Sequence, residues 1–307
     1  SGGSAGSRPA PRRSGAPGDG RRTATAATPA GSSSVAVAGS SPAVSPAGDL
    51  RATANRRRLP LLCATGGLVP GLVAGLVLGF AVGSIAGVVA GVVVLVAAAL
   101  WLARGALPLA LRTVGGRPAA DGELPALVNL VEGLGATFGV RAPQLWLVDD
   151  PVGNACTVAG TSGRAVLVVT TGLVGQLDLI ELEGVVAHEM AHVKCHDAAV
   201  SAVAVATVGM AARMTGVDRW VHSAVGYGRE YAADRRAVLG VRYPPGLRDA
   251  LAVLSKGPSP VPGSVFTGGR WAATRWLWID PMVGRRGHAA EGQLDATAVR
   301  RDALAEW

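Results

Sequence analysis

The sequence predicts an α+β protein that is mostly helical, has a small β-sheet and is preceded by a hairpin of two transmembrane helices. Three observations lead to this fold class. No charged residue occurs between Leu59 and Ala103. After this stretch, apolar residues recur at helical spacing in several segments, whereas only three short segments have the composition of strands. The first 58 residues have almost no large apolar side chain.

Residues 1–58 are expected to form a disordered tail. The segment holds nine Arg against two Asp and is otherwise rich in Ser, Gly, Pro and Ala, so it carries most of the net charge of +8. Such a composition cannot bury a core. Its charge favours attraction to anionic lipid. Because the tail has no aromatic residue to stack on bases, we expect no specific nucleic-acid partner.

Residues 59–112 are expected to form the transmembrane hairpin. One helix through the 45 uncharged residues would be about 67 Å long, about twice the hydrocarbon thickness. We therefore expect two helices, Leu61–Val82 and Ile85–Leu102, rather than one long buried helix. Arg residues flank both ends of the pair. By the positive-inside rule, a multi-pass protein of the cell membrane with its following domain in the cytoplasm is expected.

Glycines recur every four residues through this hairpin. The set is Gly67, Gly71, Gly75, Gly79, Gly83, Gly87 and Gly91. Small residues at this spacing let helix backbones approach closely. Packing of the two helices on each other is the favoured interpretation. A homo-oligomer formed through the hairpin, or recognition of another membrane helix, remains open.

Residues 113–307 are expected to form a domain of mixed α and β structure. Apolar spacing predicts a helix over Gly122–Phe138, and a short strand follows at Leu145–Val148. Two further strands, Ala155–Ala159 and Arg164–Thr170, read as a hairpin around residues 161–163. Together these strands make the small sheet.

The second half of this domain reads as helical. Asp178 and Glu181 fit a capping pair at the start of one helix. Further helices are expected at Gly226–Gly240, at Gly246–Ser255 and from Glu291 on. The uncharged segment Ala198–Ala212, which is short for a membrane span, is interpreted as a buried helix rather than a third crossing. For Trp271, Trp276 and Trp278, core packing or membrane-interface anchoring is favoured over lining a groove.

The sequence His188-Glu189-Met190-Ala191-His192 is the most specific motif of the chain. Positions four apart lie on one face of a helix, so both imidazoles can bind one metal ion. Glu189 stands beside them, where it can take a proton from a water that the metal activates. The pattern predicts a zinc hydrolase.

A third ligand is predicted at Glu230. Glu230 and Asp234 are four residues apart and share a helical face. Two His and one Glu are a known catalytic zinc set that leaves the fourth position to water. Asp234 would then accept a hydrogen bond from the non-ligating nitrogen of a zinc-bound His, namely His188. The alternative is a solvated charge pattern in which neighbouring Arg residues, such as Arg229, pair with the carboxylates.

These motifs resemble the HtpX-type membrane metallopeptidases, whose relatives include the CAAX prenyl proteases and a mitochondrial inner-membrane stress protease. The resemblance extends from the membrane segment to Arg286 and is also carried by residues 154–156, 168–173 and 183–187 and by Asp197. It implies a zincin-type metalloprotease fold with one Zn²⁺ per chain. It also implies an endopeptidase that cleaves membrane or misfolded proteins, a form of protein quality control, at the cytoplasmic face.

The chain also departs from the family pattern. The interval between the His motif and Glu230 is short and holds one apolar segment, where bacterial members have a further membrane hairpin. The family's His-Pro pair followed by Arg appears as Asp280-Pro281 followed by Arg286. Cys156 stands where the family tends to have an aromatic residue. These differences indicate a divergent subgroup.

The mechanism expected from these residues is peptide hydrolysis with Glu189 as general base. A side chain would help to stabilise the oxyanion, and Arg286 or His222 is the candidate. The polypeptide substrate would add itself as a strand beside residues 154–159, with Asn154 holding the peptide.

Other interpretations remain. A catalytically silent membrane scaffold that binds client proteins is the main alternative, although it would have no use for Glu189. A prenyl-peptide protease would need more membrane helices. A lipid- or nucleic-acid-tethered module with structural zinc would need a fourth ligand. Cys195 and His196 lie near the motif but are not expected to bind the ion. Only two Lys accompany 27 Arg, a skew typical of high-GC bacteria.

Overall fold

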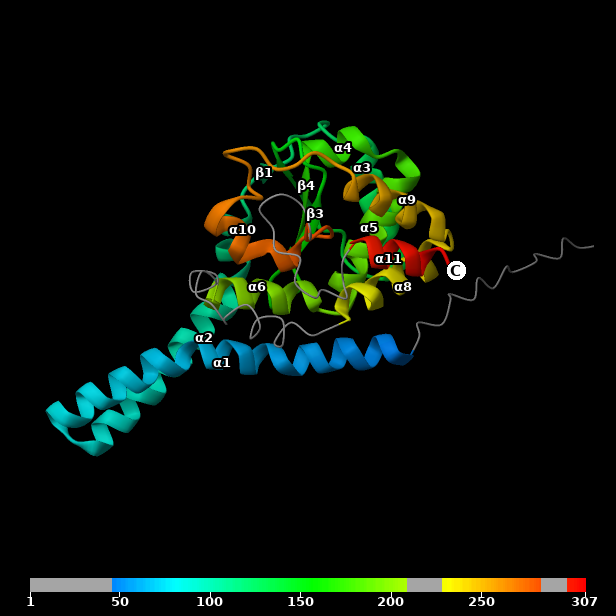
Figure 1. The fold of residues 1–307 in the computed structure, drawn as a ribbon. Helices are drawn as coiled ribbons and strands as arrows, with labels where there is room; N and C mark the ends of the chain where they lie inside the picture. Colours follow the sequence, from blue (N-terminus) through cyan, green and yellow to red (C-terminus); the bar gives the residue numbers. More distant parts are fainter. Residues whose placement is uncertain (1–45, 209–227, 283–296) are drawn as a thin grey trace, which may run out of the picture. The chain divides into compact units, whose positions relative to one another are not determined.

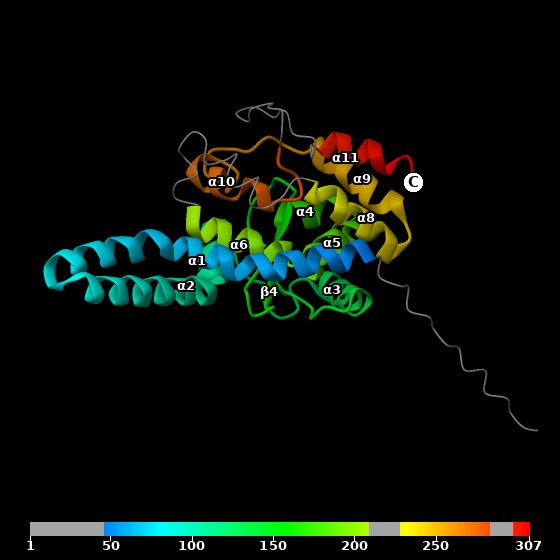
Figure 2. The same ribbon diagram turned by 90° about the horizontal axis from the view of Figure 1, so that it is seen from below.

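The computed structural model describes residues 46–208, 228–282 and 297–307, and its ribbon is drawn in Figures 1 and 2. Two long helices open the described chain: α1 (Pro46–Val82) and α2 (Ser84–Val114). Gly83 joins them with a φ of 129°, a conformation that suits a residue without Cβ. The expected turn between two apolar helices is confirmed, and both helices are long and apolar enough to cross a membrane.

The sheet has four strands in the order β1-β2-β4-β3. These are β1 (Arg117–Pro118), β2 (Gln144–Val148), β3 (Ala155–Ala159) and β4 (Ala165–Thr170). β2 and β4 are parallel, whereas β1 pairs antiparallel with β2 and β3 pairs antiparallel with β4. The expected β3–β4 hairpin is therefore confirmed, and β3 is an edge strand of this sheet.

Helices make up most of the remaining described chain. They are α3 (Pro125–Phe138), α4 (Thr171–Gln176), α5 (Leu179–Lys194), α6 (Asp197–Val208), α8 (Arg229–Val241), α9 (Pro244–Ser255), α10 (Gly268–Thr274), the 3-10 helix η2 (Arg275–Leu277) and α11 (Thr297–Leu304). The fold class is confirmed: a mostly helical protein with a small mixed sheet, in which two apolar helices precede the domain.

Side chains of β4 alternate between two buried faces of the sheet. Leu167 and Val169 belong to a core cluster with α3, α5 and α9. Val166 and Val168 belong to a second cluster, formed with the end of α2, with α6 and with the tryptophan-containing segment. Because both faces are covered, the strand reads as a nearly continuous apolar run. The sheet thus holds α5 on one face and α6 on the other.

Three tryptophans lie in the second of these clusters. Trp271, Trp276 and Trp278 are buried, and the ring of Phe266 packs edge-to-face against two of them, with centroids 5.6 Å from Trp271 and 4.8 Å from Trp278. Core packing is therefore confirmed for these residues. Segment α6 is likewise buried over residues 198–205, as expected for a helix that leans on the core.

Helix α1 begins earlier than expected. The expectation of disorder is wrong for residues 46–58, which are helical. Asn55 and Leu59, one turn apart, are buried against α6 and its N-terminus. Tertiary contacts, not local composition, therefore stabilise this part of the helix. The rest of the expected tail lies outside the described residues.

The glycine stripe is used where α1 and α2 pack together. A Cβ added at Gly87 would lie 2.5 Å from the carbonyl oxygen of Gly75, and one at Gly71 would lie 2.9 Å from that of Gly91. Real Cβ atoms do not approach backbone atoms this closely. The packing interpretation of the stripe is confirmed for these pairs.

Candidate metal centre

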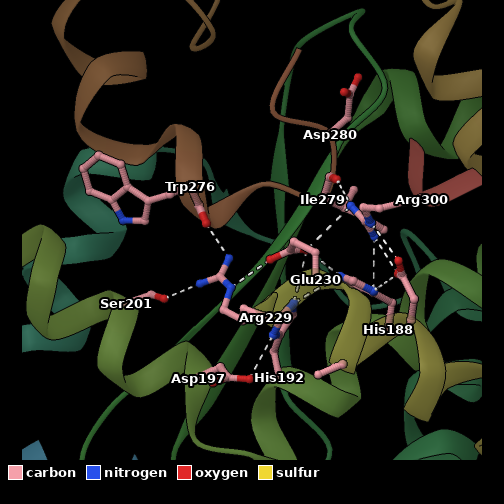
Figure 3. Close-up of polar contacts among 12 residues, drawn as sticks. His188, His192, Asp197, Ser201, Arg229, Glu230, Trp276, Ile279, Asp280 and Arg300 are labelled. Atoms are coloured by element: carbon pink, nitrogen blue, oxygen red, sulfur yellow. Dashed lines mark hydrogen bonds and ion pairs between the residues drawn. The ribbon is translucent and has the colours of Figure 1, made fainter. Parts of the chain in front are cut away.

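The two histidines of the motif lie one turn apart on α5. The helix starts with a capping box, in which Asp178 Oδ1 accepts a hydrogen bond of 2.8 Å from the Glu181 amide and Glu181 Oε2 accepts one of 2.9 Å from the Asp178 amide. The expected capping pair is confirmed. Ten residues later the helix is fully buried, and His188 and His192 project from it toward α8 (Figure 3).

Three ligand atoms converge between α5 and α8. His188 Nε2 lies 3.1 Å from His192 Nε2 and 3.1 Å from Glu230 Oε2, and His192 Nε2 lies 3.6 Å from the same oxygen. In a tetrahedral zinc site with ligand distances of 2.0–2.1 Å, neighbouring ligand atoms are about 3.3 Å apart. The structure thus brings together the three residues that were predicted as ligands.

The other nitrogen of each imidazole faces a carboxylate. His188 Nδ1 lies 2.7 Å from Asp234 Oδ1, which is the contact expected for Asp234. His192 Nδ1 lies 3.5 Å from Asp197 Oδ2. In the neutral state that binds a metal, an Nδ1–H donated to each carboxylate leaves both Nε2 atoms as lone-pair acceptors. Two such acceptors and a carboxylate oxygen repel one another unless a cation lies among them, so the donor set fits a zinc ion.

Two arginines lie beside Glu230, the third ligand candidate. Arg229 Nε donates to Glu230 Oε1 at 2.8 Å, and Arg300 Nη1 lies 3.6 Å from Oε2. Burial raises the pKa of Glu230, but the charges of Arg229 and His192 outweigh burial, and the pKa lies well below its ordinary value. Glu230 therefore offers a charged oxygen to a cation.

Arg229 is buried and ties three elements together. Its guanidinium donates to Ser201 Oγ of α6 at 2.6 Å, to the backbone oxygen of Trp276 and to Glu230. The surface salt-bridge interpretation of this arginine is therefore wrong. Its position beside Glu230 was the only sequence signal of this role.

Arg300 is a residue of the site that sequence reasoning missed. It comes from α11 and is fully buried (Figure 3). Its guanidinium forms a fork on Asp234, with distances of 2.8 Å from Nε to Oδ2 and 2.7 Å from Nη2 to Oδ1, and it donates to the Ile279 carbonyl at 2.6 Å. Such bidentate pairs fix geometry as well as charge. Arg300 thus orients Asp234, which in turn faces His188.

The pKa of two site groups shows the balance of charges. Burial lowers the pKa of His192, but Glu230 and Asp197 outweigh burial and raise it to about 9. Burial raises the pKa of Asp234, but Arg300 outweighs burial and the pKa is lowered. The metal-free site therefore holds ionised carboxylates around a cationic imidazole, a charge pattern that a bound cation can replace.

Helix α1 contacts the site through Asp197, at the N-terminus of α6. Asn55 Nδ2 donates to Asp197 Oδ1 at 2.7 Å and to the Cys195 carbonyl at 2.8 Å. Arg51 Nε lies 3.0 Å from Asp197 Oδ1. The other oxygen of Asp197 faces His192. A segment expected to be disordered thus holds the carboxylate that orients a ligand candidate.

The carboxylate of Glu189 is buried, and neither oxygen has a hydrogen-bond partner among the described residues. A buried charge without partners is costly. Its charge is felt by the Cys156 thiol of β3: burial first, and Glu189 second, hold the pKa of Cys156 well above its ordinary value. Glu189 therefore lies near the edge strand β3, and its carboxylate forms no hydrogen bond with the described residues.

Asn154 is engaged by the chain itself. Its Nδ2 donates to the Asp280 carbonyl at 2.8 Å, and its Oδ1 accepts from the amides of Asp280 at 3.1 Å and Ala155 at 3.0 Å. The Ile279 amide also donates to the Ala155 carbonyl at 2.9 Å. Asn154 thereby fastens the Ile279–Asp280 segment to the start of β3. The oxyanion candidates Arg286 and His222 lie outside the described residues.

Comparisons with known proteins agree with this geometry. A family model described as peptidase family M48 matches residues 123–239. The chain is 33% identical over 184 residues to a protease HtpX homolog of Dictyoglomus thermophilum, covering 49% of this chain and 61% of the relative. It is 34% identical over 186 residues to that of Tropheryma whipplei strain Twist, covering 50% and 64%.

The chain spans about three fifths of the length of these curated relatives. No solved structure matches it significantly. The matched family segment contains α5 and most of α8, and hence all three ligand candidates. Residues 123–239 thus match the model of peptidase family M48, and the chain is similar to protease HtpX homologs.

Proposed function

We propose that the chain is a membrane-anchored, zinc-dependent endopeptidase that hydrolyses peptide bonds of membrane or misfolded proteins. The observation that carries the proposal is the triangle of His188 Nε2, His192 Nε2 and Glu230 Oε2, with edges of 3.1, 3.1 and 3.6 Å, beside the unpartnered carboxylate of Glu189. A metal triangle and a free base are the parts that metal-assisted hydrolysis needs.

Zinc bound by these three residues supplies Lewis-acid polarisation of a water and of the scissile carbonyl. Glu189 accepts the proton of the attacking water and afterwards delivers it to the leaving amine. Asp234 and Asp197 keep the imidazole rings in the tautomer that presents Nε2. The charge of Arg229 helps to keep Glu230 ionised. Arg286 is the proposed donor to the developing oxyanion.

The substrate is proposed to bind as an extended strand along β3. In the described sheet this strand pairs with β4 on one side only, the Ile279 amide bonds the carbonyl of its first residue, and the rest of such an edge can accept a further strand. The thiol of Cys156 in β3 feels the charge of Glu189, so a peptide laid here passes close to the base. Asn154 supports this edge by holding the segment at residues 279–280.

Anchoring is proposed through α1 and α2. Their apolar segments expose large apolar side chains such as Phe80, Ile85 and Trp101, a costly arrangement in water that suits contact with lipid. Arginines precede the first apolar segment and follow the second. This charge distribution favours a cytoplasmic position for the peptidase domain. The peptidase proposed here would therefore act beside the inner face of the membrane.

The test compares the parent chain with Glu189→Gln in detergent and zinc. We expect the parent to cleave an unfolded substrate such as casein, and the variant to bind the same stoichiometric zinc without cleaving. Glu183→Gln, which alters a partly exposed carboxylate on the same helix, should keep both properties.

Two results would contradict the proposal. A folded parent without stoichiometric zinc would remove the metal site. A zinc-loaded parent that cleaves no faster than Glu189→Gln would favour a catalytically silent scaffold that binds clients.

A further inference from the structure

A cleft of about 550 Å³ lies where α1 meets the domain. We call it the basic cleft, because four cations line it: Arg56, Arg57, Arg141 and Lys194. Arg56 and Arg57 come from α1, Lys194 ends α5, and Arg141 follows α3. The turn between β3 and β4 forms a further wall, at Gly160 and Gly163. None of the lining residues is acidic.

These four cations have no carboxylate partner among the side chains that the structure describes. Other arginines of the same surface do: Arg51, just over one turn earlier on α1, pairs with Asp197 at 3.0 Å, and Arg117 pairs with Glu123 at 2.6 Å. Like charges gathered around one concave surface repel one another. A bound anion would relieve this repulsion, so the cleft has the charge of an anion site.

His196 completes one wall without adding charge. Arg56 Nη2 lies 3.3 Å from His196 Nε2. Burial, and then the nearby charge of Arg56, lower the pKa of His196, so the ring is neutral at physiological pH and accepts this hydrogen bond. The contact uses one of the five N–H donors of Arg56 and leaves the others for a ligand.

The cleft lies at the boundary of the apolar hairpin. Arg57 precedes Leu59, the first residue of the uncharged stretch, by two positions, or about 3 Å along a helix. On the opposite wall, Thr161 donates to the carbonyl of Ala103, the last residue of that stretch, at 2.8 Å. Lipid headgroups occupy roughly 5–8 Å beyond the hydrocarbon on each side of a bilayer. With α1 and α2 inserted in a bilayer, the cleft would lie at the depth of the lipid phosphates.

We propose that the basic cleft binds a phosphate-bearing anion, and that its position at the membrane boundary makes the headgroup of an anionic lipid the ligand. Arginine forks match phosphate oxygens in a bidentate manner, and a lysine adds a point charge. One phosphate would be held from both sides, by α1 and by the domain. The inference rests on the proposed insertion of α1 and α2 into the membrane and is independent of peptidase activity.

The test measures binding to the full-length chain in a non-ionic detergent by titration calorimetry. The probes are a short-chain phosphatidylglycerol, the matching phosphatidylcholine and inorganic phosphate. The cleft variant carries Arg57→Gln, Arg141→Gln and Lys194→Gln. A matched control carries Arg58→Gln, Arg104→Gln and Arg112→Gln, which removes the same charge from exposed positions beside the hairpin but outside the cleft.

We expect phosphatidylglycerol to bind the parent and phosphatidylcholine to bind far more weakly. Each cation near an anionic surface contributes about fivefold in affinity, so the cleft variant should lose about a hundredfold and the control less than about fivefold. Should the triple variant unfold, the three single substitutions each predict about a fivefold loss.

Inorganic phosphate distinguishes the source of the ligand. Phosphate that binds as tightly as the lipid, with the same loss in the cleft variant, would keep the anion site but overturn the lipid assignment. Equal losses in the cleft variant and the control, or no preference for phosphatidylglycerol, would overturn the site. Retention in the membrane after carbonate washing reports insertion separately, so failure of the cleft and failure of the anchor are distinguishable.

Discussion

The amide of Asn55 donates a 2.7 Å hydrogen bond to the carboxylate of Asp197, 142 residues further along the chain. The first residue lies on the helix that continues into the apolar hairpin, and the second faces His192 from the other side. Helix α1 and the candidate metal centre are thus two hydrogen bonds apart, with distances of 2.7 and 3.5 Å.

Replacing Asp197 by Asn should weaken zinc binding. The change removes the carboxylate that faces Nδ1 of His192, and such outer partners typically contribute 10–100-fold in metal affinity. Asn55 contacts Asp197 rather than a histidine, so Asn55→Ala should lower the zinc affinity by less than about tenfold. Competition with a chromophoric chelator measures both, with Arg58→Gln on the same helix as the control. Equal affinity in the Asp197 variant and the parent would contradict the role given to this residue.

Arg300→Met should destabilise the fold, because it leaves the buried carboxylate of Asp234 without its partner. Removing one member of a buried ion pair costs about 3–5 kcal/mol. Thermal unfolding measures the loss. The neighbouring Arg301→Gln is the control, since among the described residues Arg301 pairs with Asp302 at the surface and such changes stay within about 0.5 kcal/mol. Arg300→Lys keeps the charge but loses the fork, and it should bind zinc more weakly while remaining folded.

Zinc binding should release a proton and strengthen as the pH rises. The pKa of His192 in the metal-free protein is about 9, and only the neutral imidazole binds a metal. The apparent affinity should therefore increase about tenfold per pH unit until the pH reaches that value. Titration calorimetry in buffers of different ionisation enthalpy detects the proton. If zinc binding released no more protons at neutral pH than above pH 9, the coupling between zinc binding and deprotonation of His192 would be disproved.

The raised pKa of His192 also predicts how the stability of the metal-free protein depends on pH. The pKa of His192 in the folded protein is raised above its ordinary value of 6.5. The protonated ring therefore contributes its full stabilisation of the fold below about pH 6.5, and this contribution is lost as the pH rises through about 9. Melting temperatures of the chelator-treated protein should fall over this window. Zinc-loaded protein should show no such decline, because the ring is then neutral throughout.

Two alanine substitutions in the glycine stripe should behave differently. A Cβ at Gly87 would lie 2.5 Å from backbone atoms of Gly75 and Gly79, whereas a Cβ at Gly79 would meet its nearest neighbour at 3.8 Å. Overpacking of this kind costs about 1–3 kcal/mol. Gly87→Ala should therefore lower the melting temperature in detergent, and Gly79→Ala should not. A similar loss in both variants would show that the helices do not pack through this face.

The ligand candidates could be predicted from the sequence because each lies in a short motif: His188 and His192 are four residues apart on one helix, and Glu230 is four residues from Asp234 on another. The residues around them could not. Arg300 reaches Asp234 only after the chain returns through α11, and Asn55 reaches Asp197 only after the sheet has formed. Nothing in the composition near either residue distinguishes it from a surface side chain.

Local composition also gave a wrong boundary. The arginines and small residues before Leu59 are typical of disorder, yet burial of Asn55 and Leu59 against α6 stabilises a helix there. In contrast, the capping box at Asp178 and the β3–β4 hairpin were predicted correctly, because both depend on contacts within a few residues. Sequence reasoning therefore succeeded where the stabilising contacts are short-range.

The shared core of α2 and the sheet bears on how a soluble fragment could be prepared. Ala110, Leu111 and Val114 of α2 lie in the same buried cluster as Val166 and Val168 of β4. A fragment begun at residue 113, the expected start of the domain, would expose that cluster and discard Asn55 as well. If the chain acts as the proposed membrane-anchored peptidase, proteolytic release of the domain from α1 and α2 would inactivate it rather than set it free, because its folding would depend on these helices.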